Sequence, residues 1–286
     1  MFISTQAHLS YSNGNLMITA ETNKSLPLCE ISTIIIETTL ASITSALIIK
    51  AMENGIAILF CNDRHQIQSE VVSLTSHHSQ SGNVHIQCKW QSKTKDKLWA
   101  SIIKEKISMQ KQVLLQATGT CPQIMSKYYK NVTDGDATNR EGQAARIHFN
   151  TLFGIDFIRH EDDQNNAMLN YGYAILHSRV SQAVILCGYI TNIGIKHIGK
   201  TNPFNLSYDL IEPFRPLVDA IVYRHRSEVL NQECKKDLIN VLYQKISYGG
   251  RIFSVGDAIE LFVRDCLNSM KKEEMLLKKM KIVATQ

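Results

Sequence analysis

The hydrophobic pattern of residues 1–75 is that of short strands with a single helix. Apolar and polar side chains alternate over 7–11 and 16–20, and Asn13-Gly14 lies between these two stretches. Asn-Gly readily adopts the positive φ angles of a tight hairpin turn. The pattern therefore predicts a β-hairpin near the start of the chain.

Further along this region, two strand patterns enclose one helical pattern. Residues 31–37 are nearly all β-branched or apolar, and 55–61 are apolar, so both predict strands with at least one buried face. Residues 41–55 instead space apolar side chains at helical intervals and stop at Asn54-Gly55, a helix C-terminal signal. The stretch 65–74 is a candidate partner for the last strand. We expect a small β-rich domain with a structural or dimerising role.

The next segment, residues 76–96, is polar and rich in Ser and Lys, which is typical of a linker or exposed loop. It contains the histidines His77, His78 and His85. They lack cysteine partners and helical spacing, so a solvated connection is a better interpretation of this segment than a metal site.

From residue 97 onward the pattern is helical. The stretch 98–116 predicts a helix with one buried stripe, formed by Trp99, Ile102, Ile103, Ile107, Gln110 and Leu114. Lys104, Lys106 and Lys111 are interpreted as projecting from other, solvated faces, with a contact to phosphate as the alternative. The stripe indicates that this helix packs into a core.

Several later helices are also indicated. Asn139 follows a turn at 134–136 and is a plausible helix cap, while residues 160–190 begin acidic and become a long apolar core helix. Ser254 resembles the cap of a further amphipathic helix. Residues 97–286 are therefore expected to form a larger all-α domain. The fold class is α+β, with the small β-rich domain first.

Composition adds a modest basic charge. The net charge is +5 and the isoelectric point about 8.7, which permits nucleic-acid binding without requiring it. The tail, residues 270–286, is Lys-rich and is expected to fray or to lie on an anionic surface.

Cysteine spacing and hydropathy exclude other classes. The seven cysteines are odd in number and widely spaced, so neither a disulfide framework nor a zinc motif is indicated. No apolar run reaches the roughly 18 residues that span a bilayer. The first residues lack the charged and apolar regions of a signal peptide. We expect a cytoplasmic protein without a membrane partner.

The stretch 197–216 contains several side chains that could bind a metal ion. Asp209 and Glu212 are three residues apart, so on a helix they would share a face and repel unless a cation lay between them. Pro213 disfavours helical geometry at the preceding residue, so a helix should begin or kink there. His197 lies across a loop from both acids and can return to this face.

Glu141 offers a further acid, because it is the only acidic residue between Asp136 and Asp156. Carboxylates with one imidazole, and positions left for water and phosphate, suit a hard divalent cation that assists phosphoryl chemistry. The alternative interpretation is that these residues are surface charges and an ordinary hydrogen-bonded histidine.

Four ordered motifs then suggest a family. EGQAAR begins at Glu141, LNYGYAIL covers 169–176, GIKH covers 194–197 and NPFNLSYDLIEPFRP covers 202–216. In that order they resemble the motifs of the CRISPR-associated integrase, the metal-dependent endonuclease of spacer acquisition, in its type II form. The resemblance extends over nearly the whole chain and implies that the helical domain is catalytic.

The resemblance implies roles for individual residues. Glu141, His197 and Glu212 match the three catalytic metal ligands of the family, and Asp209 matches an acid with a supporting role. Relatives often carry a second histidine directly before the ligand, where this chain has Lys196. Lys196 can instead meet a DNA phosphate.

Arginines near these motifs are the other candidates for DNA binding. Arg146 and Arg215 are expected to clamp phosphates, although each is equally suited to a buried ion pair with the acids nearby. Recognition should depend on backbone charge and DNA shape, and hence on salt.

The family resemblance also implies the reaction and the partners. Mg²⁺ or Mn²⁺ would assist attack by the 3′-hydroxyl of a short incoming spacer duplex on the edge of a CRISPR repeat, a transesterification; with water as nucleophile the site would act as an endonuclease. The expected partners are double-stranded DNA, a second copy in a homodimer, a small CRISPR-associated companion dimer and the type II RNA-guided effector nuclease.

Two alternatives belong to other classes. The chain could be a non-catalytic DNA-binding scaffold of an adaptation complex. A helical di-metal carboxylate oxidoreductase is a weaker alternative, since such sites use Glu-x-x-His repeats. Neither Glu141 nor Glu212 is followed by a histidine at that spacing.

Overall fold

The structure is a computed structural model that describes residues 1–63, 67–71, 79–159 and 161–283 of the chain. It divides into two compact units, Met1–Gln80 and Ser81–Gln286. The first is rich in strands and the second is mostly helical, so the predicted α+β class is confirmed.

Where the structure describes it, the first unit contains two four-stranded sheets and one α-helix. One sheet has the order β1-β5-β7-β8, formed by Phe2–Ile3, Thr33–Ile36, Ala57–Cys61 and Ile67–Glu70. The other has the order β4-β3-β2-β6, formed by Lys24–Pro27, Asn15–Thr19, His8–Ser12 and Ser42–Ile43. A short 3₁₀ turn, Leu28–Glu30, follows β4, and the helix is α1, Ser45–Glu53.

Local sequence signals explain these elements. Asn13 and Gly14 have φ angles of 48° and 83°, as the predicted hairpin turn between β2 and β3 requires. The side chain of Thr44 caps α1 by accepting a hydrogen bond from the backbone N–H of Leu47, and the helix ends at Asn54 as predicted. The core of this unit consists of strand and helix residues that include Leu9, Leu16, Ile34, Leu47 and Ile58.

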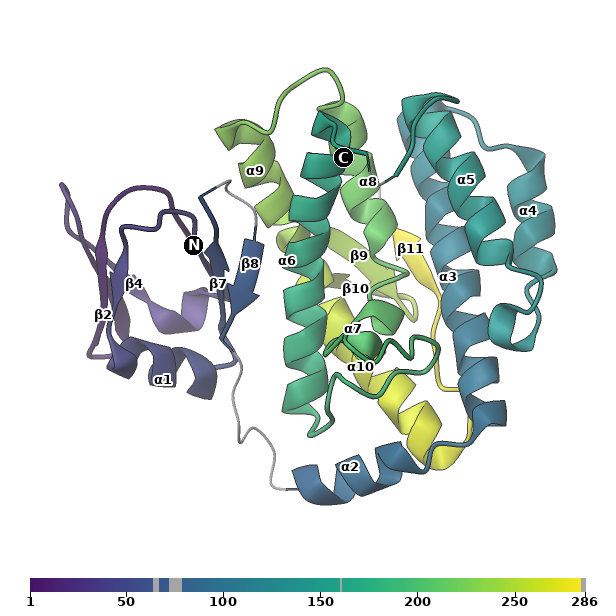
Figure 1. The fold of residues 1–286 in the computed structure, drawn as a ribbon, viewed down its shortest axis with the longest axis horizontal. Helices are drawn as coiled ribbons and strands as arrows, with labels where there is room; N and C mark the ends of the chain where they lie inside the picture. The colour runs from purple at the N-terminus through teal and green to yellow at the C-terminus, as the bar shows by residue number, and fades with distance from the viewer. Residues whose placement is uncertain (64–66, 72–78, 160, 284–286) are drawn as a thin grey trace. The chain divides into compact units, whose positions relative to one another are not determined.

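The second unit is built from long helices joined by short ones. Its α-helices are α2 Gln80–Cys88, α3 Ser92–Thr118, α4 Gln123–Lys130, α5 Arg140–Phe153, α6 Gln164–Leu186, α7 Asn205–Leu210, α8 Arg215–Arg224, α9 Gln232–Ile239 and α10 Val255–Lys272. Two 3₁₀ turns, Asp134–Asp136 and Asn240–Tyr243, precede α5 and follow α9. Figure 1 shows α8 lying between α3 and α6.

Helices α3 and α6, which both pack against α8, form the centre of this unit. All six residues of the stripe predicted on α3 are buried, and α6 is buried along most of its length. Gly172 in α6 permits close approach of α8, because a Cβ there would lie 2.5 Å from Cγ1 of Val218. The predicted core helix over 160–190 is thus confirmed as α6.

The second unit also holds a small sheet that the helical pattern did not predict. Strand β9, Lys245–Tyr248, pairs antiparallel with both β10, Arg251–Ser254, and β11, Met280–Ile282. Strand β11 belongs to the tail that was expected to fray. The tail is held because the buried carboxylate of Glu105 accepts hydrogen bonds from Lys279 Nζ at 2.6 Å and from the Met280 backbone N–H at 3.1 Å.

Much of the predicted linker 76–96 is likewise ordered. Residues 76–78, which include His77 and His78, lie outside the described part of the chain. The rest differs from a solvated connection, because α2 and the start of α3 occupy it. Two polar residues of α2, Asn83 and Gln87, are buried and donate hydrogen bonds to backbone carbonyls of the segment 187–193. A helix that docks through amide side chains leaves no apolar stripe in the sequence.

All seven cysteines lie in the described part of the chain, and all are free thiols. Among the described helices, none combines the length and the apolar character that crossing a bilayer demands.

Candidate active site

The N-terminus of α5 positions Glu141. The buried carboxylate of Asp136 accepts hydrogen bonds from the backbone N–H groups of Arg140 and Glu141, both at 2.9 Å. Asn139 caps the same helix by accepting from the Gly142 N–H at 3.1 Å, which confirms its predicted role. A side chain at Gly142 would collide with Asn139, because a Cβ would lie 2.8 Å from Oδ1. Glu141 is thereby fixed in the first turn of the helix.

The loop between α6 and α7 positions His197 around one buried carboxylate. Oδ2 of Asp209 accepts hydrogen bonds from the backbone N–H groups of Ile195 and Lys196, at 2.6 and 3.0 Å. Oδ1 accepts from the His197 backbone N–H at 3.1 Å and faces the imidazole Nδ1 at 2.6 Å. A Cβ at Gly194 would lie 2.4 Å from the His197 carbonyl oxygen, so only glycine fits this tight loop.

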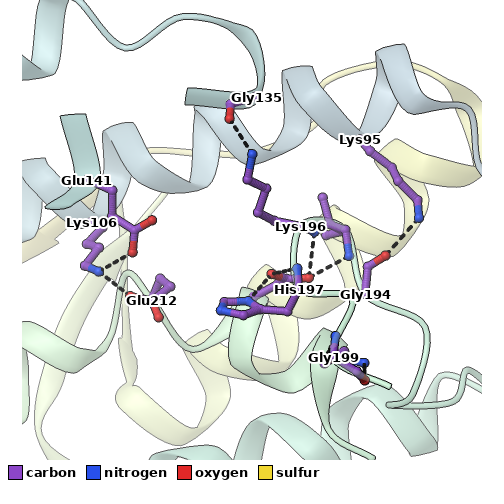
Figure 2. Close-up of polar contacts among 12 residues, drawn as sticks. Lys95, Lys106, Gly135, Glu141, Gly194, Lys196, His197, Gly199 and Glu212 are labelled. Atoms are coloured by element: carbon purple, nitrogen blue, oxygen red, sulfur yellow. Dashed lines mark hydrogen bonds and ion pairs between the residues drawn. The ribbon is translucent and has the colours of Figure 1, made fainter. Parts of the chain in front are cut away.

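Side chains from elsewhere in the unit hold the rest of this loop. Asn205 donates through Nδ2 to the carbonyls of Asn192 and Gly199, both at 2.9 Å. Lys95 of α3 donates to the Gly194 carbonyl at 2.9 Å, and Lys196 donates to the Gly135 carbonyl at 2.9 Å, as Figure 2 shows. The loop is therefore tied to α3 and to the turn before α5.

A helix break positions Glu212, as Pro213 predicts. Helix α7 ends at Leu210 and α8 begins at Arg215, with Glu212 in the turn between them. The carboxylate is buried, and its Oε1 atom lies 3.1 Å from Nε of Arg215. The Arg215 guanidinium lies over the ring of Tyr173, 4.9 Å from its centroid. Arg215 thus forms the buried ion pair that the sequence left as one alternative for it.

Lys106 joins the two glutamates. From the middle of α3 its Nζ lies 2.7 Å from Oε1 of Glu141 and 2.5 Å from Oε2 of Glu212, and Figure 2 shows it between them. The contact with Glu141 has hydrogen-bond geometry, whereas the contacts of Glu212 with Lys106 and Arg215 are ion pairs without it. The lysine side chain is only 10% exposed.

The interpretation of Lys106 as part of a solvated face is therefore wrong. Its sequence position contained the correct signal, because it lies four residues after Ile102 and four before Gln110. Both of those residues belong to the predicted buried stripe, and residues four apart share a helix face.

The opposite charges of the site shift the pKa values of Lys106 and Glu212 so that both groups stay ionised. Burial acts to lower the pKa of Lys106, but the negative charges of Glu212 and Glu141 outweigh it and raise the pKa. Burial acts to raise the pKa of Glu212, but Arg215 and Lys106 outweigh it and lower the pKa. Both side chains are therefore held in their charged forms.

His197 lies beside this ion cluster and is partly exposed. Its hydrogen bond to Asp209 is the largest influence that raises the pKa of the imidazole, and Glu212 and Glu141 also contribute. Since Asp209 occupies Nδ1, the Nε2 atom is left as the ring nitrogen that can meet a ligand.

The donor chemistry fits a divalent cation. Glu141 and Glu212 already share one cationic group, and His197 presents a free ring nitrogen next to them. Within the described ranges, no three His, Cys, Asp or Glu side chains gather closely enough to form a metal site as they stand. The ammonium of Lys106 lies between the two carboxylates, within ion-pair distance of each.

The structure also shows the surroundings of the predicted residues Asp209 and Arg146. Asp209 and Glu212 were expected to need a cation between them, but each has its own partners: the loop and His197 for Asp209, Lys106 and Arg215 for Glu212. Asp209 supports His197 through Oδ1 and the preceding loop backbone through Oδ2. Arg146 is exposed on α5, five residues beyond Glu141 and hence about 140° around the helix from it.

The sequence matches a known protein family. Residues 1–238 match the family model described as CRISPR associated protein Cas1. The CRISPR-associated endonuclease Cas1 of Neisseria meningitidis is 31% identical over 271 residues, which cover 92% of this chain and 89% of the relative.

Solved structures share the fold. A casposase bound to integration product has a TM-score of 0.78 at 19% identity, covering 97% of this chain and 92% of that chain. A Cas6-RT-Cas1–Cas2 complex has a TM-score of 0.71 at 18% identity, covering 99% of this chain and 36% of that chain. These likenesses confirm the mixed architecture of strands followed by helices.

Proposed function

The chain belongs to the Cas1 family of CRISPR-associated proteins, the endonucleases and integrases of CRISPR adaptation, and from this premise we propose its specific reaction. It uses a divalent metal ion to join the 3′-hydroxyl ends of short foreign DNA duplexes to the repeat of a CRISPR array by transesterification. With water in place of the 3′-hydroxyl, the same site hydrolyses DNA. The observation that carries this proposal is the pair of carboxylates, Glu141 and Glu212, that share one cation beside the imidazole of His197.

Glu141, Glu212 and Nε2 of His197 would hold the ion. Two carboxylates suit Mg²⁺, and one imidazole nitrogen shifts the preference towards Mn²⁺. When bound, the ion would polarise a phosphoryl oxygen and stabilise the leaving 3′-oxygen.

Other residues orient these ligands. Arg215 holds the Glu212 carboxylate on the side away from Lys106, and its own plane is fixed by the Tyr173 ring. Asp209 fixes the tautomer and the direction of the His197 ring. The carboxylates therefore need little rearrangement when substrate arrives.

Positive side chains near the site are the proposed DNA contacts. Arg146 is exposed on α5 and free to meet a phosphate. Lys196 uses one donor on the Gly135 carbonyl, and an ammonium has two more. Arg215 is largely buried in its ion pair, so its contact with DNA would be limited to the exposed edge of the guanidinium. Contacts of this kind make binding strongly salt-dependent.

Solved structures of similar fold support part of the proposed assembly. A solved structure of similar fold is a Cas1–Cas2 complex, and another is bound to integration product. We propose that this chain forms a homodimer through its first unit, binds a small companion dimer of the Cas2 type and double-stranded DNA, and receives DNA with help from the type II effector nuclease. We propose a cytoplasmic location to go with these partners.

The test is an in vitro assay that joins a short duplex to a repeat-bearing plasmid. Wild type should join ends in Mg²⁺ or Mn²⁺, and EDTA or a 3′-dideoxy terminus should abolish joining. Glu141→Ala should keep duplex binding and lose joining, whereas the matched control Glu274→Ala, an exposed acid, should join normally. Joining by Glu141→Ala at the wild-type rate would contradict the assigned site. Wild type that binds the duplex but does not join it in Mg²⁺ or Mn²⁺ would favour the non-catalytic scaffold.

A further inference from the structure

The ammonium of Lys106 lies between two glutamates, the buried Glu212 and the partly exposed Glu141, whose like charges would otherwise repel. Its nitrogen lies 2.7 Å from Glu141 and 2.5 Å from Glu212. We propose that Lys106 is a resident counter-cation that holds the metal-free site in its folded arrangement, and that a divalent ion binds by displacing the Lys106 ammonium. This inference rests on the proposed function of the site.

Charge balance supports an exchange rather than an addition. The two carboxylates are matched by one ammonium and one guanidinium, from Lys106 and Arg215. A divalent ion added to this balanced, partly buried cluster would leave an uncompensated double charge beside the buried Glu212, which is costly where water is limited. Departure of the ammonium removes part of that excess.

Geometry decides which of the two cations leaves. Arg215 is held by the Tyr173 ring and by its place at the start of α8, beside Glu212 in the chain. Lys106 reaches the site on a flexible four-carbon stem from α3, and its contact with Glu212 has no hydrogen-bond geometry. Rotation about the bonds of this stem can move the ammonium, whereas Arg215 cannot leave Glu212 without also leaving the Tyr173 ring.

Two consequences follow for this chain. The carboxylates of Glu141 and Glu212 stay oriented before the metal arrives, so the free protein is stable. The same lysine competes with the metal, so the affinity for divalent ions is lower than the ligands alone would give. A structural ion pair without this role would affect stability but not metal affinity.

Direct metal binding separates these cases. Binding of Mn²⁺ to the full-length chain is measured from the electron paramagnetic resonance signal of the free ion, and thermal unfolding is followed with and without Mn²⁺. Lys106→Met should bind Mn²⁺ at least about tenfold more tightly than wild type, because a nearby positive charge is removed. Without metal, Lys106→Met should unfold at a lower temperature than wild type. Addition of Mn²⁺ should raise its unfolding temperature by more than it raises that of wild type.

The matched control is Lys104→Met, which removes a lysine of the same helix that lies outside the site. It should bind Mn²⁺ like wild type. If Lys106→Met binds Mn²⁺ as tightly as wild type or more weakly, the proposed displacement of the Lys106 ammonium is wrong. If wild type itself binds no Mn²⁺, the proposed function of the site fails instead, so the two failures are distinguishable.

A second measurement covers the case in which Lys106→Met does not fold. In wild type labelled with ¹⁵N at lysine Nζ, the buried ammonium of Lys106 should give a slowly exchanging signal, assigned by its loss in Lys106→Arg. Addition of Mg²⁺ should remove or strongly shift this signal while other lysine signals stay in place. A signal unchanged at saturating Mg²⁺ would contradict displacement.

Discussion

Asp209 holds His197 by two bonds to the same oxygen: Oδ1 accepts the His197 backbone N–H at 3.1 Å and pairs with the imidazole Nδ1 at 2.6 Å. Its other oxygen accepts two further N–H groups of the loop. One fully buried carboxylate therefore fixes both the loop and the ring nitrogen that is offered to a ligand.

Asp209→Asn tests this arrangement. An amide keeps one acceptor oxygen but turns an NH₂ group towards loop N–H donors, so the loop and the ring lose their alignment. We expect metal affinity and strand joining to fall by about 10- to 100-fold, as for other residues that orient metal ligands. Calorimetric Mn²⁺ titration and the joining assay measure this. Asp162→Asn, at an exposed acid, is the control, and equal loss in both variants would reject the role of Asp209.

Gln87→Leu tests the support that α2 gives to the same loop. Gln87 donates to the carbonyls of Ile190 and Ile193 at 2.8 and 2.9 Å and accepts from the Ile190 N–H at 3.1 Å. Leucine keeps the approximate volume but leaves these groups unpaired, at a cost of about 1–3 kcal/mol. We expect faster hydrogen exchange over 190–197 and slower joining with duplex binding retained.

The exposed residue Gln116 provides the matched control for that experiment. Gln116→Leu should leave exchange and joining unchanged. If residues 190–197 of Gln87→Leu exchange backbone hydrogens at the wild-type rate, α2 does not hold the loop.

His177 gives the second unit a pH-dependent stability. Its ring packs against Tyr208 and Phe204, and its buried Nε2 atom has no hydrogen-bond partner in the described structure. Burial, assisted by the charge of Arg215, lowers the pKa of His177 to about 4. The unfolded chain therefore takes up this proton before the folded one, and stability falls as the pH decreases from about 6.5 to about 4.

The variant His177→Gln cannot titrate and isolates this effect. Between those pH values wild type should lose up to about 3 kcal/mol more of its free energy of unfolding than the variant does. Urea unfolding at a series of pH values measures the difference. Parallel curves for the two proteins would mean that His177 is not buried as described.

Glu105→Gln tests the anchoring of the tail on α3. The neutral amide weakens the bond to Lys279 and mispairs the Met280 N–H, so we expect a loss of about 1–3 kcal/mol in the free energy of unfolding. Hydrogen exchange should increase over 280–282. Lys281→Met changes an exposed side chain on the same strand and should have little effect. Unchanged exchange in Glu105→Gln would show that β11 is held without this carboxylate.

Local sequence patterns predicted the elements whose signals are local. The Asn13-Gly14 turn, the Asn139 cap and the break at Pro213 each depend on residues within one turn of the chain, and all three are present. The buried stripe of α3 was also recognisable, because its period alone marks a helix face.

The features missed by sequence depend on distant partners. Helix α2 docks through Gln87 on a loop about a hundred residues later, and β11 depends on Glu105 of α3. Lys106 was assigned to the surface because lysine is usually solvated, although its position on the stripe indicated burial. Its two glutamate partners come from α5 and from the turn after α7, and no spacing in the sequence relates the three.

The central claim is that Glu141, Glu212 and His197 converge on one divalent ion. Crystals of the wild-type chain grown with Mn²⁺ and measured at a wavelength where manganese scatters anomalously test it most directly. We expect a single anomalous peak per chain within about 2.3 Å of an oxygen of each glutamate and of Nε2 of His197, with the Lys106 ammonium moved away. A saturated crystal with no peak there, or with its peak at other residues, would contradict it.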